Sequence, residues 1–131
     1  MNKTVQQYLL ICDHAFLDKN NKLNVIGLFD NVNLNTLPGN ILKIVIIGCY
    51  EMGLDLESTV SLEVNILRPD NSQLIHLDNK SAAINSSDNT LRFVFEMGNL
   101  KFDKEGIHSI EVLVNGEKIG LRTFTVKKQS N

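Results

Sequence analysis

Residues 58–68 read STVSLEVNILR, and apolar and polar side chains alternate along this stretch. Every second position from 60 to 66 is valine, leucine or isoleucine. Successive side chains of a β-strand point to opposite faces, so the pattern predicts a strand with one buried and one exposed face. Pro69–Ser72 follows and is typical of a turn, because proline presets φ and Asp and Asn close turns with their own side chains. We therefore expect a hairpin from this strand to Gln73–Leu77.

The same two-residue period recurs outward from this hairpin in both directions. Gly98-Asn99 interrupts one run, and a bulge or corner is the natural cause. No segment shows a helical stripe with proper caps. About seven to nine short strands at close spacing predict an all-β sandwich or barrel. The other expected strands are Tyr8–Phe16, Leu23–Leu34, Ile41–Met52, Leu91–Phe102, Gly106–Val114 and Glu117–Val126.

Length and composition predict a single globular domain over residues 1–131. The hydrophobic fraction of 43% and the charged fraction of 21% are ordinary for such a domain. The net charge of −2 argues against a nucleic-acid surface, which needs a basic patch.

The N-terminal apolar stretch Tyr8–Cys12 is too short for a secretory signal or a membrane helix. We therefore expect no membrane span and a location in the cytoplasm or, for a phage protein, in the virion. Cys12 and Cys49 both lie within apolar runs, which indicates two small buried side chains in a reducing compartment.

Near the C-terminus, Asn115-Gly116 joins two apolar runs and predicts a hairpin with a type I′ turn. A two-residue loop pairs Val112 with Ile119, but continuing that register turns Phe124 to the opposite face. A bulge near Arg122 or Thr123 would restore the apolar face. We interpret this hairpin as closure of the core.

One segment departs from the half-buried pattern, because Ile41–Tyr50 is apolar at both parities. Such a run is typical of a strand that is covered on both faces. A loop, the chain terminus or another subunit would cover the outer face. If a subunit covers it, the interface residues would be Lys43, Val45 and Ile47.

Candidate metal ligands are sparse. Zinc sites show tight ligand pairs, whereas the sequence offers a single C-x-H pair at Cys12 and His14. The loop from Asp18 begins like a calcium loop, but Leu23 stands where glycine is needed and Phe29 where a glutamate should close the frame. Turn chemistry is therefore the favoured explanation of its Asp and Asn residues.

Catalytic and phosphate-binding patterns also fail to form. Asp13 and His14 are adjacent, so their side chains point to opposite faces of a strand. The sequence has no G-x-S-x-G elbow and no phosphate loop. His108 opens a strand at the edge of the expected core, where a structural role is favoured over that of a base. We expect no catalytic residue, no cofactor and no metal.

The order of strands and turns resembles an uncharacterised family of small β-sandwich proteins from bacteria and phages. The likeness is carried by Leu9–Asp13, by Lys22–Asp30 and by Val60–Asn71, where Asn71 takes the place of a glycine. It extends through Phe102–Val126, where His108 takes the place of an aromatic residue. The resemblance implies a single antiparallel β-sandwich of immunoglobulin-like or C2-like build, and it implies no activity.

Two classes of function follow. The first is a non-catalytic protein-binding or assembly module, whose partner is another protein or a second copy of the chain. The alternative is a ligand-binding domain that takes calcium, a lipid headgroup or carbohydrate on its Asp- and Asn-rich loops. An enzyme is disfavoured because no set of residues forms a catalytic constellation.

Overall fold

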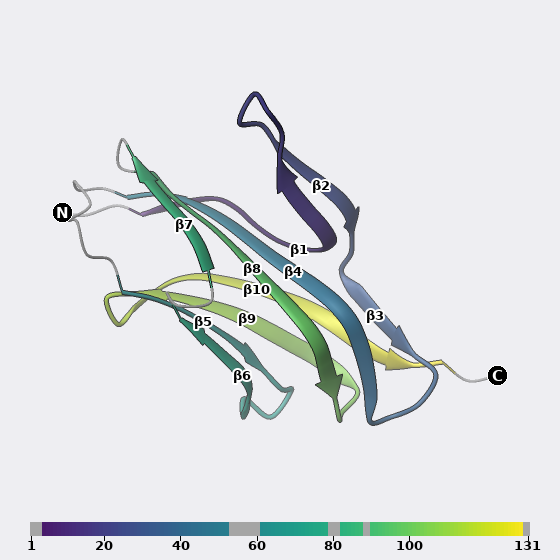
Figure 1. Ribbon diagram of the computed structural model, residues 1–131. Coiled ribbons are helices and arrows are strands. Elements are labelled where there is room, and N and C mark those ends of the chain that lie inside the picture. Colours follow the sequence, from purple (N-terminus) through teal and green to yellow (C-terminus); the bar gives the residue numbers. More distant parts are fainter. Residues whose placement is uncertain (1–3, 53–60, 79–81, 88–89, 130–131) are drawn as a thin grey trace.

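The computed structural model describes residues 4–52, 61–78, 82–87 and 90–129, and of 82–87 the backbone only. The described residues form ten strands and no helix, which confirms the all-β class (Figure 1). The described part of the chain therefore has no helix able to cross a membrane. The strands are β1 (Val5–Leu17), β2 (Leu23–Leu28), β3 (Asn31–Leu34), β4 (Gly39–Glu51), β5 (Leu62–Leu67), β6 (Gln73–Asp78), β7 (Ala82–Ser87), β8 (Thr90–Phe102), β9 (Gly106–Val114) and β10 (Glu117–Lys128).

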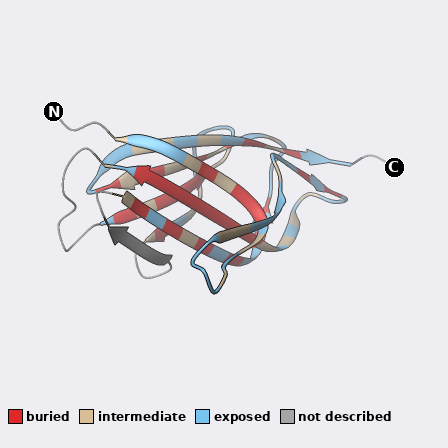
Figure 2. Ribbon diagram, turned by 90° about the horizontal axis from the view of Figure 1, so that it is seen from above, coloured by how far each residue is buried: buried red, intermediate tan, exposed pale blue. Residues whose placement is uncertain are grey.

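The strands form two five-stranded sheets. The first has the order β2-β1-β4-β8-β7 and the second the order β3-β10-β9-β5-β6. A single core cluster draws its buried residues from both sheets, so the sheets face one another. Figure 2 shows the buried residues concentrated on the central strands, with exposed residues at the ends and along the outer hairpins.

Two differences explain why ten strands form where about seven to nine were expected: the segment Leu23–Leu34 divides in two, and β7 (Ala82–Ser87) was not predicted. The segment Leu23–Leu34 was predicted as one strand, but β2 pairs with β1 in the first sheet and β3 pairs with β10 in the second. Val32 and Leu34 of β3 are buried, because the chain has crossed to the other sheet.

This crossing also makes one prediction wrong, because the sheets are not purely antiparallel. β3 runs parallel to β10, with Val32 opposite Val126, and every other described pair is antiparallel. A tight hairpin joins only antiparallel neighbours. β3 follows a strand of the other sheet and pairs with the C-terminal residues of β10. A local period of two gives no information on such a long-range pairing.

The corner expected at Gly98-Asn99 is present. Leu91, Phe93, Phe95 and Met97 face the core, and the buried side then passes to Leu100 and Phe102. Asn99 has φ of 53°. Leu42, which lies across from Asn99 on β4, is 80% exposed. The pairing of β4 with β8 keeps one register on both sides, so both strands change face together.

The C-terminal hairpin has the expected turn, because Asn115 and Gly116 have φ of 52° and 81°. The bulge expected near Arg122 or Thr123 is in the wrong place. The register shifts between Lys118 and Gly120, so Gly120 and not Ile119 lies opposite Val112. A Cβ at position 120 would collide with the Tyr50 hydroxyl, so the bulge places the one residue without a side chain against that ring.

The hairpin between β5 and β6 is confirmed from Leu62 onward, while residues 58–60 lie outside the described residues. Its turn is closed as the sequence predicts. Asn71 has φ of 67°, and Asp70 Oδ1 accepts hydrogen bonds from the backbone nitrogen of Ser72 at 3.0 Å and from its Oγ at 2.6 Å.

Candidate functional site

The outer face of β4 carries the feature that the sequence singled out. All residues from Ile44 to Tyr50 are buried. Ile44, Ile46 and Tyr50 belong to the core between the sheets, whereas Val45 and Ile47 join Cys12 in a second cluster on the opposite face. The partly buried residues that cover this second cluster come from the same sheet and are Tyr8, Leu10, Ala15, Leu23 and Val94.

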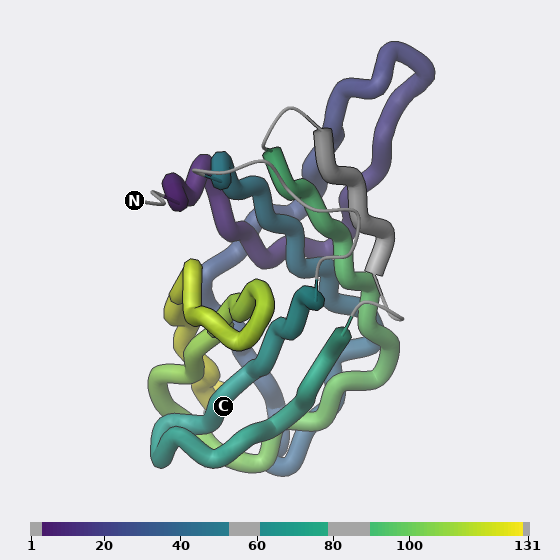
Figure 3. The backbone as a smooth tube through the Cα atoms, turned by 90° about the vertical axis from the view of Figure 1, so that its left-hand side faces the viewer, coloured from purple at the N-terminus to yellow at the C-terminus, as the bar shows by residue number. Residues whose placement is uncertain are grey.

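The cover is therefore part of the chain itself. Leu23 is the first residue of the edge strand β2, and it packs against the second cluster. The β1–β2 hairpin projects from the rest of the sheet on its outer side (Figure 3). Neither a separate loop nor the chain terminus supplies these residues. The expectation that something covers the outer face of β4 is confirmed, with an adjacent hairpin as the cover.

The three residues predicted as an interface have different surroundings. Val45 and Ile47 are 0% exposed beneath the hairpin. Lys43 lies at the rim, with Nζ 2.6 Å from His14 Nδ1 and 3.3 Å from Glu96 Oε1. An interface that includes these positions stays a prediction, and Lys43 is the member that reaches the surface.

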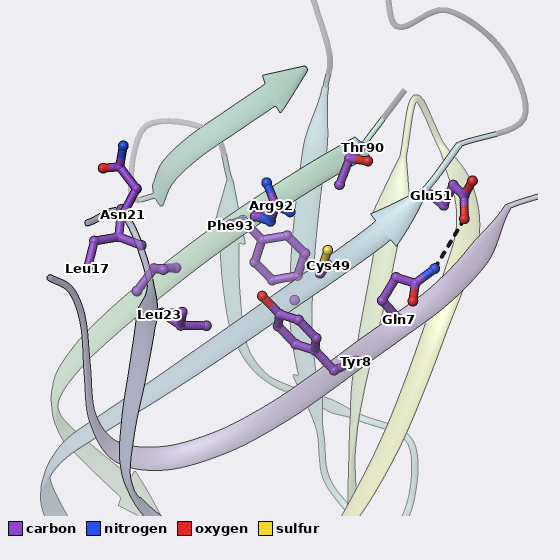
Figure 4. A pocket seen from close by; sticks show the side chains of 12 residues that line it. Gln7, Tyr8, Leu17, Asn21, Leu23, Cys49, Glu51, Thr90, Arg92 and Phe93 are labelled. Atoms are coloured by element: carbon purple, nitrogen blue, oxygen red, sulfur yellow. Dashed lines mark hydrogen bonds between the residues drawn. The ribbon is translucent and has the colours of Figure 1, made fainter. Parts of the chain in front are cut away.

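Between the hairpin and the sheet lies a groove of about 930 Å³, the candidate functional site (Figure 4). Leu17, Asn21 and Leu23 of the β1–β2 hairpin form one wall. β1, β4 and β8 form the floor. The lining residues from these three strands are Gln7, Tyr8, Gly48, Cys49, Glu51, Thr90, Arg92, Phe93 and Val94.

The strand register arranges the floor in rows. Tyr8 of β1 pairs with Cys49 of β4, and Cys49 pairs with Arg92 of β8. The next row toward the hairpin is apolar and consists of Leu10, Ile47 and Val94. A polar row and an apolar row thus lie side by side on one surface, because residues two apart share a face.

The polar row has its own electrostatics. Burial raises the pKa of the Tyr8 hydroxyl, the Cys49 thiol raises it further, and the Arg92 guanidinium opposes the change. The Tyr8 hydroxyl therefore stays protonated at neutral pH and is available as a donor.

Glu51 lies at the other end of the groove from the hairpin. Its Oε2 accepts a hydrogen bond from Gln7 Nε2 at 3.2 Å. Arg92 forms no ion pair with any carboxylate in the described part of the chain. The groove thus holds one cation without a described anionic partner.

The histidines are dispersed in the structure. His76 Nδ1 lies 2.6 Å from Asn65 Oδ1. His108 is fully buried, with Nδ1 3.1 Å from the carbonyl oxygen of Gly106. Its ring packs against Phe102 and Phe124, with centroid distances of 5.4 and 5.5 Å. Residues 4–52, 61–78 and 90–129 contain no group of three His, Cys, Asp or Glu side chains placed to hold a metal ion.

The cysteines also lie apart. Cys12 and Cys49 are free and buried, as the sequence predicted. They pair with different residues along the sheet, Val45 and Tyr8 respectively. Cys12 Sγ donates to the carbonyl oxygen of His14 at 3.5 Å, so its neighbour in the C-x-H pair contacts it through the backbone.

The acidic loops close on themselves. Asp18 Oδ1 accepts hydrogen bonds from the backbone nitrogens of Lys22 at 3.0 Å and Asn20 at 2.8 Å, and the first of these contributes most to lowering the pKa of its carboxyl. The hydrogen bonds from Ser72, followed by that from Lys104, lower the pKa of Asp70 well below its usual range. Asp18 is held within its own turn, and Asp70 is held by its turn and by Lys104, 3.1 Å away. Ligand binding by these loops stays a prediction.

Sequence reasoning missed an exposed apolar surface on the β1–β2 hairpin. Of the nine large hydrophobic residues that are exposed in the described part of the chain, five belong to this hairpin. The signal was present in Val25-Ile26, which is apolar at both parities like the segment 41–50. We name this surface the hairpin patch, and its residues are Phe16, Leu17, Val25, Ile26 and Leu28.

The two facing sheets define an all-β protein with a groove on the outer side of one sheet. Residues 7–127 match the model of DUF6941, a family of unknown function, and the chain belongs to this family. The resemblance to an uncharacterised family is thereby confirmed.

Comparison with the curated proteins found no match. Among solved structures, the chain is similar to the alkylpurine DNA glycosylase AlkC from Pseudomonas fluorescens, bound to DNA containing an abasic site analog. The identity is 14% and the TM-score is 0.47, with 91% of this chain and 30% of that chain covered. The chain thus spans under a third of that protein.

Proposed function

We propose that the chain is a non-catalytic assembly module, a β-sandwich of immunoglobulin-like or C2-like build, that associates with a second copy of itself through the β1–β2 hairpin. The observation that carries this proposal is the hairpin patch, which concentrates exposed apolar side chains on one element. The β1–β2 register puts Phe16, Ile26 and Leu28 on one face of the hairpin. Exposed apolar side chains that gather on one element are typical of interaction sites.

The edge position of β2 supports the same surface. Among the described strands β2 pairs with β1 alone, so its other side presents backbone donors and acceptors. Natural edge strands are usually protected by charged side chains or proline, and Leu23–Leu28 contains neither. An unprotected edge with apolar side chains favours the addition of another strand.

The sequence around β2 fits an identical partner. In an antiparallel pair of two β2 strands with Ile26 on the two-fold axis, Lys22 of one copy comes near Asp30 of the other, because Lys22 precedes β2 and Asp30 follows it at equal distances from Ile26. Both residues are exposed. Two opposite-charge pairs would then flank an apolar centre, which gives the interface a defined register.

A cytoplasmic location, or a location in the virion for a phage protein, is part of this proposal. Two buried free thiols are compatible with a reducing compartment. The non-catalytic assignment is supported by the dispersed histidines, since nucleophile, base and orienting group must lie within hydrogen-bond reach of each other.

The oligomeric state tests the proposal. We expect light scattering to give a dimer for the wild-type protein and a monomer for Ile26→Lys, because the charge would be buried at the two-fold axis. Ile107→Lys is the matched control, since Ile107 is 61% exposed and Ile26 55% exposed, and Ile107 lies on β9. A wild-type monomer at all practical concentrations would refute self-association through this surface.

The charge pairs test the register. Lys22→Asp or Asp30→Lys alone should weaken the dimer severalfold, because each places like charges opposite one another twice. The double variant should restore it. If the two single changes are simply additive in the double variant, the dimer does not use this register.

A further inference from the structure

We propose that the groove under the β1–β2 hairpin binds a small amphipathic carboxylate, with its anionic group at Arg92 and its apolar tail under Leu17 and Leu23. The groove shares Leu17 with the hairpin patch, but none of the β2 residues of that patch lines it. Its volume of about 930 Å³ is in the range of sites for small molecules.

Charge indicates the anionic end. Among the described residues that line the groove, Arg92 is the one cation, and the one carboxylate, Glu51, accepts a hydrogen bond from Gln7. A guanidinium in a concave surface with apolar walls attracts an anion more strongly than one on a convex surface, because the walls exclude water. Arg92 has the planar donor geometry that matches a carboxylate.

The polar row supplies a second donor. Tyr8 and Arg92 lie on either side of Cys49 in one row across three strands. Figure 4 shows the Tyr8 ring and Arg92 on the same floor of the groove. Because the Tyr8 hydroxyl is protonated at neutral pH, it can donate to a carboxylate oxygen that Arg92 also contacts.

The apolar end lies in the direction of the hairpin. Val94 is two residues from Arg92 on the same face, and it packs with Leu23 against the second cluster. Leu17, 61% exposed, extends this wall. A tail that starts at Arg92 would therefore cross Val94 and cover leucine side chains that water now contacts, which is favourable in proportion to the apolar area buried.

This arrangement selects against other classes of ligand. A phosphate or nucleotide site usually offers several cations or a nest of backbone N–H groups, whereas the described lining of this groove offers one guanidinium. A purely apolar ligand would leave Arg92 desolvated without a partner. A ligand with one negative charge and one apolar tail would match the polar row at Arg92 and the apolar row at Val94.

Titration with decanoate tests the inference, with decanol and butyrate as the two separate parts of the ligand. We expect decanoate to bind saturably and to raise the melting temperature, and each of the other two to bind at least about tenfold more weakly, since a charged hydrogen bond and the tail burial each contribute this much. Equal binding of decanoate and decanol would overturn the assignment of the anionic end. Equal binding of decanoate and butyrate would overturn the assignment of the apolar end.

Arg92→Gln should lower decanoate affinity by about tenfold or more without changing the melting temperature of the free protein, because the side chain is exposed. Lys101→Gln is the matched control, since it removes one positive charge from an exposed position of β8 that does not line the groove. Unchanged affinity in Arg92→Gln, or an equal loss in Lys101→Gln, would overturn the proposal. The monomeric variant Ile26→Lys should still bind decanoate, which separates this site from the dimer.

Discussion

Gly48 lies opposite Phe93 in the ladder between β4 and β8, where a larger residue has no room. A Cβ at Gly48 would collide with the Phe93 ring, which is 1% exposed in the core and cannot move aside. We expect Gly48→Ala to lower the free energy of unfolding by about 1–3 kcal/mol through overpacking. Urea denaturation with an unchanged m-value measures this.

Gly98→Ala provides the control for that change. Gly98 lies on the neighbouring strand, and the nearest atom to a Cβ there is the carbonyl oxygen of Leu42 at 3.7 Å. The substitution should be close to neutral. Equal stability of the two alanine variants would contradict the collision with Phe93.

His108 is a residue whose protonation should control stability. Burial, the largest effect, lowers its pKa below the ordinary value of 6.5. The unfolded chain then binds the proton more readily than the folded protein, so stability should fall as pH drops below about 6.5. Carboxylates with lowered pKa, such as Asp103, lose their contribution only near and below 3.8, which separates the two effects.

His108→Phe should remove this loss of stability between pH 7 and pH 5 while keeping the ring contacts with Phe102 and Phe124. The free energy of unfolding, measured by denaturant at several pH values for both proteins, checks it. Two parallel pH profiles would show that the imidazole is not the group that titrates.

The turn of the C-terminal hairpin requires a left-handed backbone at Gly116, although there is room for a side chain at this position. Gly116 has φ of 81°, and a Cβ there would meet nothing within 4 Å. We expect Gly116→Ala to cost about 1–2 kcal/mol from the left-handed backbone alone. Thermal unfolding measures the loss, and an unaffected melting temperature would mean that the turn adopts another form without cost.

The strands show how far local patterns predict structure. Period two located β1, β4, β6, β8, β9 and β10 to within a few residues, because alternation reports burial on a single face. It placed the β10 bulge wrongly near Arg122, since nothing in the local pattern shows that Tyr50 lies over Gly120. The division into β2 and β3 was missed for the same reason: which sheet a strand joins is decided by distant partners.

The candidate site was predictable in part. The doubly apolar segment 41–50 correctly indicated a covered outer face on β4. The residues that cover it were not predictable, because Leu23 packs against the second cluster only once the hairpin has formed and folded toward the sheet. The row from Tyr8 to Arg92 needs the registers of two strand pairs, and neither register is encoded in any short stretch of sequence.

For the whole molecule, the two sheets and the protruding hairpin should differ in their protection from hydrogen exchange. β4 and β8 lie in the centre of the first sheet and are buried on the core side, so their amides should exchange through global opening only. The β2 amides that face the open edge are exposed in a monomer and would be hydrogen-bonded to a second copy in the proposed dimer.

Hydrogen exchange at β2 should therefore depend on protein concentration, whereas exchange at β4 should not. We expect exchange at β2 to slow as protein concentration rises through the dimer dissociation constant, because association stabilises this edge by mass action, while exchange at β4 stays constant. Ile26→Lys should show fast exchange at β2 at every concentration, and Ile107→Lys should behave like the wild-type protein. Slow, concentration-independent exchange at β2 in both variants would mean that the hairpin edge is protected within a single chain, and the surface proposed for assembly would have to lie elsewhere.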